Sequence, residues 1–172
     1  MRSLKIATKN KRITIMKMNN FTIIAIATLS LAVTAWLIAR PFPLSGDCME
    51  PAVKDGQLCF LNQTTPYLKH YQINDIIVFS HEGKDWISRI VALEGNTIKI
   101  TEGSIIVNDV ALNDAGISRN WSGWNFGTNA IDQSLQVPIN HVFVLSDNLS
   151  AQHDDSRVFG PIPNSSILGS VW

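Results

Sequence analysis

Hydrophobic and polar positions divide the chain into one long apolar run and a following region of short apolar segments. Residues 21–39 form a run of 19 residues without a charged side chain. As a helix this run would rise about 28 Å, close to the thickness of the hydrocarbon core of a bilayer. The apolar core of a cleaved signal peptide is typically about 7–15 residues. We therefore expect an uncleaved transmembrane anchor, rather than a buried core helix or a removable signal peptide.

Beyond residue 40 the apolar runs are short and are bounded by glycine, asparagine and aspartate. Residues 97–101 alternate apolar and polar side chains, and Asn108 and Asp109 are typical of a hairpin turn between two such runs. Short, frequent strands predict a mainly β fold, an antiparallel barrel or sandwich. The expected strands are residues 57–62, 75–80, 86–93, 97–101, 105–112, 141–145 and 167–172.

Residues 113–140 differ from the rest of this region. They are polar and glycine-containing, yet they carry Trp121, Trp124 and Phe126. A long irregular stretch within a compact domain is uncommon and often functional. The aromatic side chains either pack the insertion onto the β domain or form an exposed apolar edge that contacts lipid or a partner segment.

Charge is balanced over the whole chain but is distributed unevenly along it. The first 20 residues carry six basic side chains and no acidic one, whereas all 14 acidic residues lie beyond residue 40. A basic flank before an apolar segment predicts residues 1–20 in the cytoplasm, residues 21–39 in the cell membrane and residues 41–172 outside. A net charge of zero argues against a nucleic-acid partner.

Cysteine and histidine are too few and too scattered to indicate a metal site, and no cofactor is expected. The extracytoplasmic location raises the question of a disulfide between Cys48 and Cys59. Cys59 lies in an expected strand, where a small buried side chain is its simplest role. A disulfide would block Cys48 as a nucleophile, and its formation depends on a Cα separation that the sequence leaves open.

Four segments carry candidate chemistry. A glycine-containing loop presents the Cys48 thiol at a surface, and a thiol of this kind needs a base within hydrogen-bond reach to become a competent nucleophile. The last segment places an aspartate, a serine and an arginine side by side. The segments are SGDCMEPA at residues 45–52, NDIIVF at residues 74–79, WISRIVALEGN at residues 86–96 and SDNLSAQHDDSRVFG at residues 146–160.

In order and spacing, these segments resemble the successive boxes of the Gram-positive type I signal peptidases. These are membrane-tethered proteases that remove leader peptides with a serine–lysine dyad. The family patterns are S-G-x-S-M-x-P-T, G-D-I-V-V-F, Y-V-K-R-V-x-G-L-P-G-D and a last box containing G-D-N and D-S-R. The resemblance implies the signal peptidase β fold behind one anchor. It assigns Gly46, Asp47, Met49 and Pro51 to binding, and Arg89, Asp147, Asn148, Asp155, Ser156 and Arg157 to structural roles.

The departures from the family pattern fall on the catalytic positions. Cys48 takes the place of the nucleophilic serine, and Ser88 takes the place of the general-base lysine. His153 falls where a serine helps to orient that lysine, and Glu94 replaces a proline. A thiol is an adequate nucleophile. A serine hydroxyl, however, does not accept a proton at working pH, and a positioned general base contributes about 10²–10⁴-fold to the rate.

The sequence therefore predicts a signal-peptidase-like protein that has lost its catalytic dyad but keeps the peptide-binding fold. Degenerate relatives of this kind act in pilus assembly. The resemblance thus implies an accessory in pilin or surface-protein assembly, with an exported precursor or pilin polypeptide, a sortase and membrane lipid as partners. An extended peptide can pair with a strand edge whether or not it is cut.

Three alternatives stay open at the level of sequence. His153, oriented by Asp154 or Asp155, would serve Cys48 as a base in an active leader peptidase, or it is a solvated loop residue. For Asp155 and Arg157, the interpretation that we favour is a buried ion pair that braces the loop. A self-cleaving repressor has a similar peptidase domain, but the expected spanning helix and the absence of a DNA-binding module disfavour it.

Overall fold

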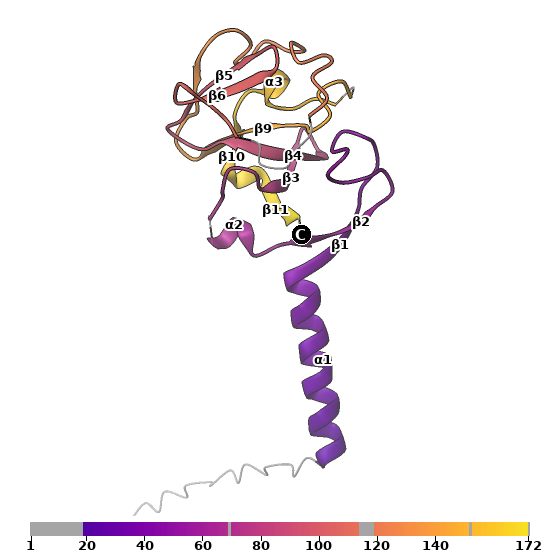
Figure 1. Ribbon diagram of the computed structural model, residues 1–172. Helices are drawn as coiled ribbons and strands as arrows, with labels where there is room; N and C mark the ends of the chain where they lie inside the picture. Colours follow the sequence, from indigo (N-terminus) through magenta and orange to yellow (C-terminus); the bar gives the residue numbers. More distant parts are fainter. Residues whose placement is uncertain (1–18, 69, 114–118, 152, 172) are drawn as a thin grey trace, which may run out of the picture. The chain divides into compact units, whose positions relative to one another are not determined.

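The computed structural model describes residues 19–68, 70–113, 119–151 and 153–171 (Figure 1). The chain forms two compact units, Met1–Thr34 and Ala35–Trp172. The basic segment expected in the cytoplasm, residues 1–20, lies almost entirely outside the described residues.

Helix α1, Asn20–Ile38, forms from the apolar run. Asn19 caps its first turn, because its side-chain oxygen accepts a hydrogen bond of 2.8 Å from the backbone N–H of Thr22. Large apolar side chains along the helix, among them Phe21 and Trp36, are exposed. None of the helices in the described part of the chain has both the length and the apolarity that crossing a membrane requires, so the expected anchor is not confirmed.

The described residues of the second unit fold mainly into two antiparallel sheets, which confirms the mainly β, antiparallel part of the expectation (Figure 1). One sheet has seven strands in the order β1-β2-β11-β3-β4-β9-β10, and the other has four in the order β7-β6-β5-β8. The strands are β1 Ala39–Pro43, β2 Leu58–Asn62, β3 Ile76–His81, β4 Lys84–Ala92, β5 Thr97–Thr101, β6 Ser104–Val107, β7 Val110–Ala111, β8 Leu135–Gln136, β9 His141–Leu145, β10 Ile162–Pro163 and β11 Ile167–Val171. The short helices are α2 Thr65–Leu68, α3 Ser156–Phe159 and the 3₁₀ helix η1 Asn164–Ser166.

The hairpin turn expected at Asn108 and Asp109 is present between β6 and β7. Both residues have positive φ angles, 51° and 64°, as a two-residue turn of this hand requires. Three strands were not indicated by the sequence. One is β8, which lies within the insertion that was expected to be irregular, and the other two, β1 and β10, contain proline and lie at the two edges of the seven-stranded sheet. Proline lacks a backbone N–H and is therefore tolerated at an edge, but it weakens the strand pattern in the sequence.

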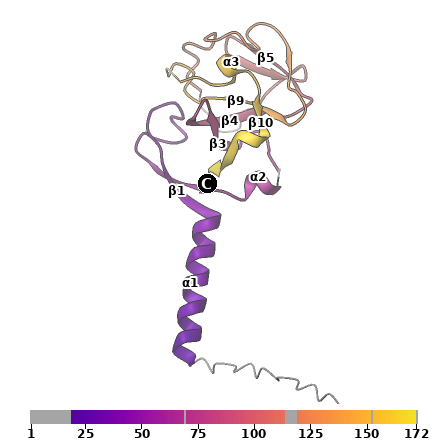
Figure 2. The ribbon, with the colours of Figure 1, turned by 180° about the vertical axis from the view of Figure 1, so that it is seen from behind.

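The core is formed by both faces of the central strands. On β3, Ile77 and Phe79 pack into one apolar cluster while Val78 packs into another, together with Ile87 of β4. A strand that is buried on both faces reads as a continuous apolar run, which is why β3 shows no alternation. Figures 1 and 2 both show β5 on the opposite side of β4 and β9 from β11. A third cluster fills the space between β5, β6 and β9.

The insertion, residues 113–140, packs partly onto this third cluster. Trp121 and Trp124 are half-buried against it, whereas Phe126 is half exposed. The two tryptophans therefore follow the packing alternative. Residues 114–118 of the insertion lie outside the described part of the chain.

Candidate functional site

The loop between β1 and β2 carries Cys48. Two backbone hydrogen bonds of 3.1 Å close its base, from Leu44 N–H to the carbonyl of Gln57 and from Gly56 N–H to the carbonyl of Leu44. Gly46 has a φ of 107°, which favours glycine, and its N–H donates to a side-chain oxygen of Asp55 at 2.8 Å. The loop is thus a closed turn with a defined path.

Cys48 is buried, and the expectation of a thiol presented at the surface is wrong. The residue is 3% exposed and packs with Leu44, Met49 and Val53, because the apolar side chains of the loop fold inward. Cys59 belongs to the same cluster. Both cysteines are free thiols, so the disulfide question is answered in the negative.

The Cys48 side chain reaches one wall of a cavity of about 370 Å³. The cavity collects residues from β1, the Cys48 loop, the start of β4 and the last box. They are Phe42, Pro43, Leu44, Ser45, Cys48, Lys84, Asp85, Trp86, Ile87 and His153. A volume in this range is sufficient for a small ligand or several side chains.

The four residues that the resemblance assigned to binding do not line this cavity. Gly46, Asp47 and Pro51 are exposed elsewhere on the loop. Met49 is fully buried in the core, where its unbranched apolar side chain fills space beneath the loop. These four residues thus lie outside the lining of this cavity, and their role in binding stays a prediction.

Ser88, at the general-base position, is fully buried on β4 opposite Ile77 of β3. Its hydroxyl donates a hydrogen bond of 2.7 Å to the carbonyl oxygen of Ile87. A hydroxyl held in this way supplies no basic nitrogen to the cavity. Position 88 is consequently occupied by a group that cannot take a proton from a thiol.

His153 is half-buried at the cavity, and the alternative of a solvated loop residue is wrong. Its Nε2 atom lies 3.1 Å from the carbonyl oxygen of Ile87. Since a carbonyl only accepts, Nε2 carries the proton and Nδ1 is left as the acceptor. The ring meets Trp86 edge-on, with ring centres 4.9 Å apart. This aromatic contact holds the ring in place. The sequence contains no sign of it, because the neighbours of His153 along the chain are polar.

Burial sets the protonation of both candidate groups. The pKa of the Cys48 thiol is raised to about 11, mainly by burial and to a smaller extent by the nearby carboxylates of Asp47 and Asp147, against the lowering effect of the backbone N–H groups of Cys48 and Met49. Burial also lowers the pKa of His153, although Asp155 and the Ile87 carbonyl partly oppose that effect. The favoured state is a neutral thiol beside a neutral imidazole.

Two buried ion pairs hold the last box, which carries His153, in place. Arg89 of β4 holds Asp147 through two hydrogen bonds of 2.8 and 2.6 Å, and a third bond joins Arg89 to the carbonyl of Asn74. Arg119 of the insertion also lies 3.4 Å from Asp147. These contacts fix the start of the last box against β4, in line with the structural role that the resemblance gave to Arg89 and Asp147.

The second pair, Asp155 and Arg157, braces the last box internally. Asp155 accepts two hydrogen bonds from the Arg157 side chain at 2.9 and 2.8 Å, and it caps α3 by accepting from the Arg157 N–H. The Ser156 hydroxyl oxygen accepts a hydrogen bond of 2.9 Å from Val144 N–H and so joins this turn to β9. Asp155 also accepts from Ser146 N–H at 3.0 Å. Position 153 is thereby held at the cavity.

Sequence reasoning missed Phe42, Lys84, Asp85 and Trp86 as cavity residues. Trp86 is fixed by an edge-on contact with Phe159 at 5.1 Å as well as by His153. Its position two residues before Ser88 on the same strand was the available signal. Lys84 and Asp85 lay outside the expected strand, because their polar side chains follow the turn at residues 82–83.

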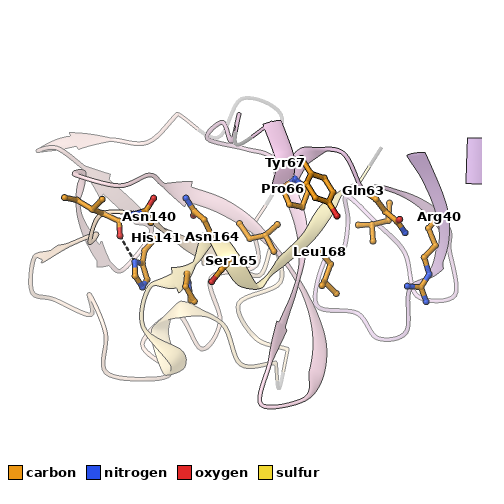
Figure 3. Close-up of a pocket in the computed structure, with 13 residues that line it drawn as sticks. Arg40, Gln63, Pro66, Tyr67, Asn140, His141, Asn164, Ser165 and Leu168 are labelled. Carbon is orange, nitrogen blue, oxygen red and sulfur yellow. Dashed lines mark hydrogen bonds between the residues drawn. The ribbon is translucent and has the colours of Figure 1, made fainter. Parts of the chain in front are cut away.

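A larger hollow, of about 900 Å³, lies elsewhere on the second unit (Figure 3). It runs past Arg40, Tyr67, Asn164 and His141 and contains none of the three candidate residues at positions 48, 88 and 153. We place the functional site at the smaller cavity, because Cys48 of the first box and His153 of the last box both line it. No group of three or more metal-ligating side chains occurs among the described residues.

The sequence pattern described as "Signal peptidase, peptidase S26" matches residues 16–172. The chain belongs to this signal peptidase family. The match includes the Cys48 loop, β4 and the last box, which together form the cavity. Membership of this family implies exported precursor polypeptides as the class of substrate.

Gram-positive relatives are similar over most of their length. The chain is 25% identical over 151 residues to "Signal peptidase I" of Bacillus amyloliquefaciens, which covers 86% of this chain and 81% of the relative. It is 25% identical over 160 residues to "Signal peptidase IB" of Staphylococcus aureus, covering 86% and 83%. The crystal structure of a signal peptidase I from Enterococcus faecalis V583 covers 59% of this chain and 96% of its own, with 26% identity and a TM-score of 0.46.

Proposed function

We propose that this signal peptidase family member binds an exported polypeptide at the Cys48 cavity without cleaving it. The observation that carries the proposal is the lack of a proton acceptor at position 88, where the Ser88 hydroxyl is buried and bonded to Ile87. With a pKa of about 11, only about one Cys48 thiol in 10⁴ is ionised at pH 7. A nucleophile that is neither ionised nor served by a lysine favours binding over hydrolysis.

The edges of the strands around the cavity support peptide binding. Among the described residues, β4 pairs with β9 only from Arg89 onward, so the first half of β4 has an unpaired edge beside the cavity. Phe42 and Pro43 reach the cavity from β1, the edge strand of the sheet. An extended peptide can add to such an edge through main-chain hydrogen bonds, with its side chains in the adjoining hollow.

The proposal includes the biological setting that the sequence indicated. The bound polypeptide is a pilin or surface-protein precursor, and the chain acts as an accessory in its assembly beside a sortase. The family membership supports an exported precursor as the class of partner. The pilin and the sortase are supported by the loss of both dyad positions, Cys48 and Ser88, which the chain shares with degenerate relatives that act in pilus assembly.

A membrane location belongs to the same proposal, with the N-terminus in the cytoplasm and residues 21–39 as the tether. Six basic residues precede this run, and the large apolar side chains of α1 are exposed. Extraction of cell membranes with alkaline carbonate and protease treatment of intact cells test it. We expect the chain to stay with the membrane and its β unit to be digested from outside. Release of the chain by carbonate would contradict the tether.

The test of binding without cleavage uses the purified full chain and a pilin precursor that retains its leader. We expect saturable binding and an intact leader after prolonged incubation, as measured by mass spectrometry. Trp86→Leu, at the cavity, should weaken binding, whereas Tyr67→Leu, in the larger hollow, should not. Leader removal that Cys48→Ala abolishes would refute the proposal.

A second candidate function is a working leader peptidase that uses Cys48 as nucleophile and His153 as base. It is favoured by one observation, that both side chains line the same cavity. Against it, the proton would have to pass from a thiol with a pKa of about 11 to a ring whose pKa is lowered below 6.5. In this case a thiol-alkylating reagent and His153→Gln would each abolish cleavage of the precursor. A protein that only binds the precursor would show no cleavage before or after either change.

A further inference from the structure

The insertion, residues 113–140, reaches the Cys48 loop through a chain of side-chain hydrogen bonds. The Asn120 amide nitrogen donates to the Ser150 hydroxyl oxygen at 2.8 Å. Because an amide nitrogen only donates, the Ser150 proton is directed to its other partner, the Asn148 side-chain oxygen, at 2.6 Å. The order of donors along the chain is therefore determined from Asn120 to Asn148.

Asn148 extends this series of hydrogen bonds to the loop that carries the Cys48 thiol. Its backbone N–H donates to the carbonyl oxygen of Cys48 at 2.9 Å, and its side-chain amide donates to the carbonyl oxygen of Asp47 at 3.3 Å. Two consecutive carbonyls of the loop are thus held by one residue. The orientation of those peptide units also sets where the backbone N–H groups beside the thiol point.

The backbone gives the same linkage in parallel. Leu149 N–H donates to the carbonyl oxygen of Asn120 at 3.1 Å, and Asn120 and Asn148 form a parallel β-bridge. Asn148 therefore lies between the insertion on one side and the Cys48 loop on the other. Asn120 itself is exposed and is no part of the apolar core, so its side chain acts through its hydrogen bonds, which include one accepted from Ser122 N–H at 3.0 Å.

We propose that Asn120 is a positioning residue for the Cys48 cavity, which it holds in shape through Ser150 and Asn148. The insertion is thereby a control on the peptide site, since loosening one hydrogen bond at its edge frees the loop that forms a wall of the cavity. The inference rests on the proposed function only in taking this cavity as the peptide site.

Alkylation of the two cysteines by iodoacetamide, resolved by peptide mass spectrometry, tests the inference in the full chain. Asn120→Asp keeps the oxygen that accepts from Ser122 N–H but removes the donor to Ser150. Asn125→Asp, on the exposed surface of the same insertion, is the control for added charge. Loss of one hydrogen bond makes local opening about 2-fold to 10-fold more frequent. We expect that increase in the alkylation rate of Cys48 for Asn120→Asp only.

Cys59 is the internal reference, since it lies in the same buried cluster but outside the hydrogen-bond chain. Its rate should not change in either variant. Ser150→Ala should raise the Cys48 rate as Asn120→Asp does, and Ser150→Thr, which keeps the hydroxyl, should restore it. Unchanged Cys48 rates, or equal increases at Cys48 and Cys59, would overturn the positioning role. Because alkylation needs no peptide, that result leaves the proposed function untouched, and precursor cleavage would refute the proposed function alone.

Discussion

Cys48, Ser88 and His153 show how environment decides the chemistry of single residues. Cys48 and His153 reach one cavity, but burial disfavours the charged form of each, so the ion pair that activates many cysteine nucleophiles is not favoured. Ser88 donates to the same carbonyl that contacts the His153 ring. The residue types alone would have allowed a competent thiol and base, whereas their surroundings favour two neutral groups.

The thiol of Cys48 should titrate far above the ordinary range of a cysteine. Its pKa is raised to about 11, mainly by burial, whereas an exposed thiol titrates near 8.5. The difference in ultraviolet absorbance between the protein and its Cys48→Ala variant, followed against pH, reports the thiolate directly. We expect half-titration near pH 11. A midpoint near 8.5 while the protein stays folded would contradict this burial effect.

His153 should make the folded state sensitive to mild acid. Its folded pKa is below 6.5, so the unfolded chain binds the proton first, and the stability associated with the neutral ring is lost as the pH falls below 6.5. We expect His153→Gln to reduce the loss of stability between about pH 7.5 and about pH 5.5 in urea denaturation. The matched variant is His70→Gln on the surface, which should retain the wild-type loss. Equal losses in all three proteins would contradict the role of His153.

At the scale of elements, the last box and the insertion act as one support for the cavity. Arg157 bonds to Asp155 within the last box and donates to the carbonyl of Gly123 in the insertion at 3.0 Å. The backbone N–H groups of Thr128 and Asn129 in turn donate to the Arg157 carbonyl at 2.9 Å. The two segments contain little regular secondary structure, yet they supply hydrogen-bond partners to each other. The buried guanidinium group of Arg157 therefore has its hydrogen bonds formed.

Gly127→Ala should strongly weaken this support. Gly127 has a φ of 98°, and a Cβ atom there would clash with the carbonyl of Arg157. We expect a loss of about 2–4 kcal/mol in the free energy of unfolding. Gly103→Ala, at a φ of 73° with open space around it, should cost only the backbone strain, about 1–2 kcal/mol. Chemical denaturation of both variants measures the difference, and equal costs would contradict the close packing at Gly127.

For the molecule as a whole, the cavity exists only because stretches of the chain that are far apart in the sequence converge. β1, the Cys48 loop, β4 and the last box contribute side chains from positions 42 to 153. The convergence also determines what restoring a dyad would require. A lysine at position 88 would enter the space beside the Ile87 carbonyl, where the His153 ring now lies.

Restoring activity should therefore need three changes. Cys48→Ser with Ser88→Lys should remain inactive on a leader-bearing precursor, because His153 crowds the lysine. Adding His153→Ser should allow the lysine to reach the serine and give cleavage, with a gain of about 10²–10⁴-fold from the general base. Cleavage rates measured by mass spectrometry compare the double and triple variants. Equal activity in the two would contradict the crowding by His153.

Much of the fold was predictable from local pattern. The strands near residues 57–62, 75–80, 86–93, 97–101 and 141–145 and the turn at Asn108 and Asp109 are present, because short apolar runs, the alternation in residues 97–101 and turn residues act over a few positions. The edge strands β1 and β10 were not predictable, since proline has no backbone N–H to donate within a sheet and therefore argues against a strand in a sequence pattern. Met49 was assigned to binding and lies in the core, since loop direction depends on contacts far along the chain.

The amino-acid sequence alone determined the family, the mainly β antiparallel class and the replacement of both dyad positions, because each depends only on which residues follow one another. The tertiary structure decided which groups meet: that His153 faces the Cys48 cavity, that the thiol is buried and neutral, and that Asn120 reaches the loop through Asn148. Burial and hydrogen-bond partners arise from segments up to a hundred residues apart, and so does the chemistry that they set.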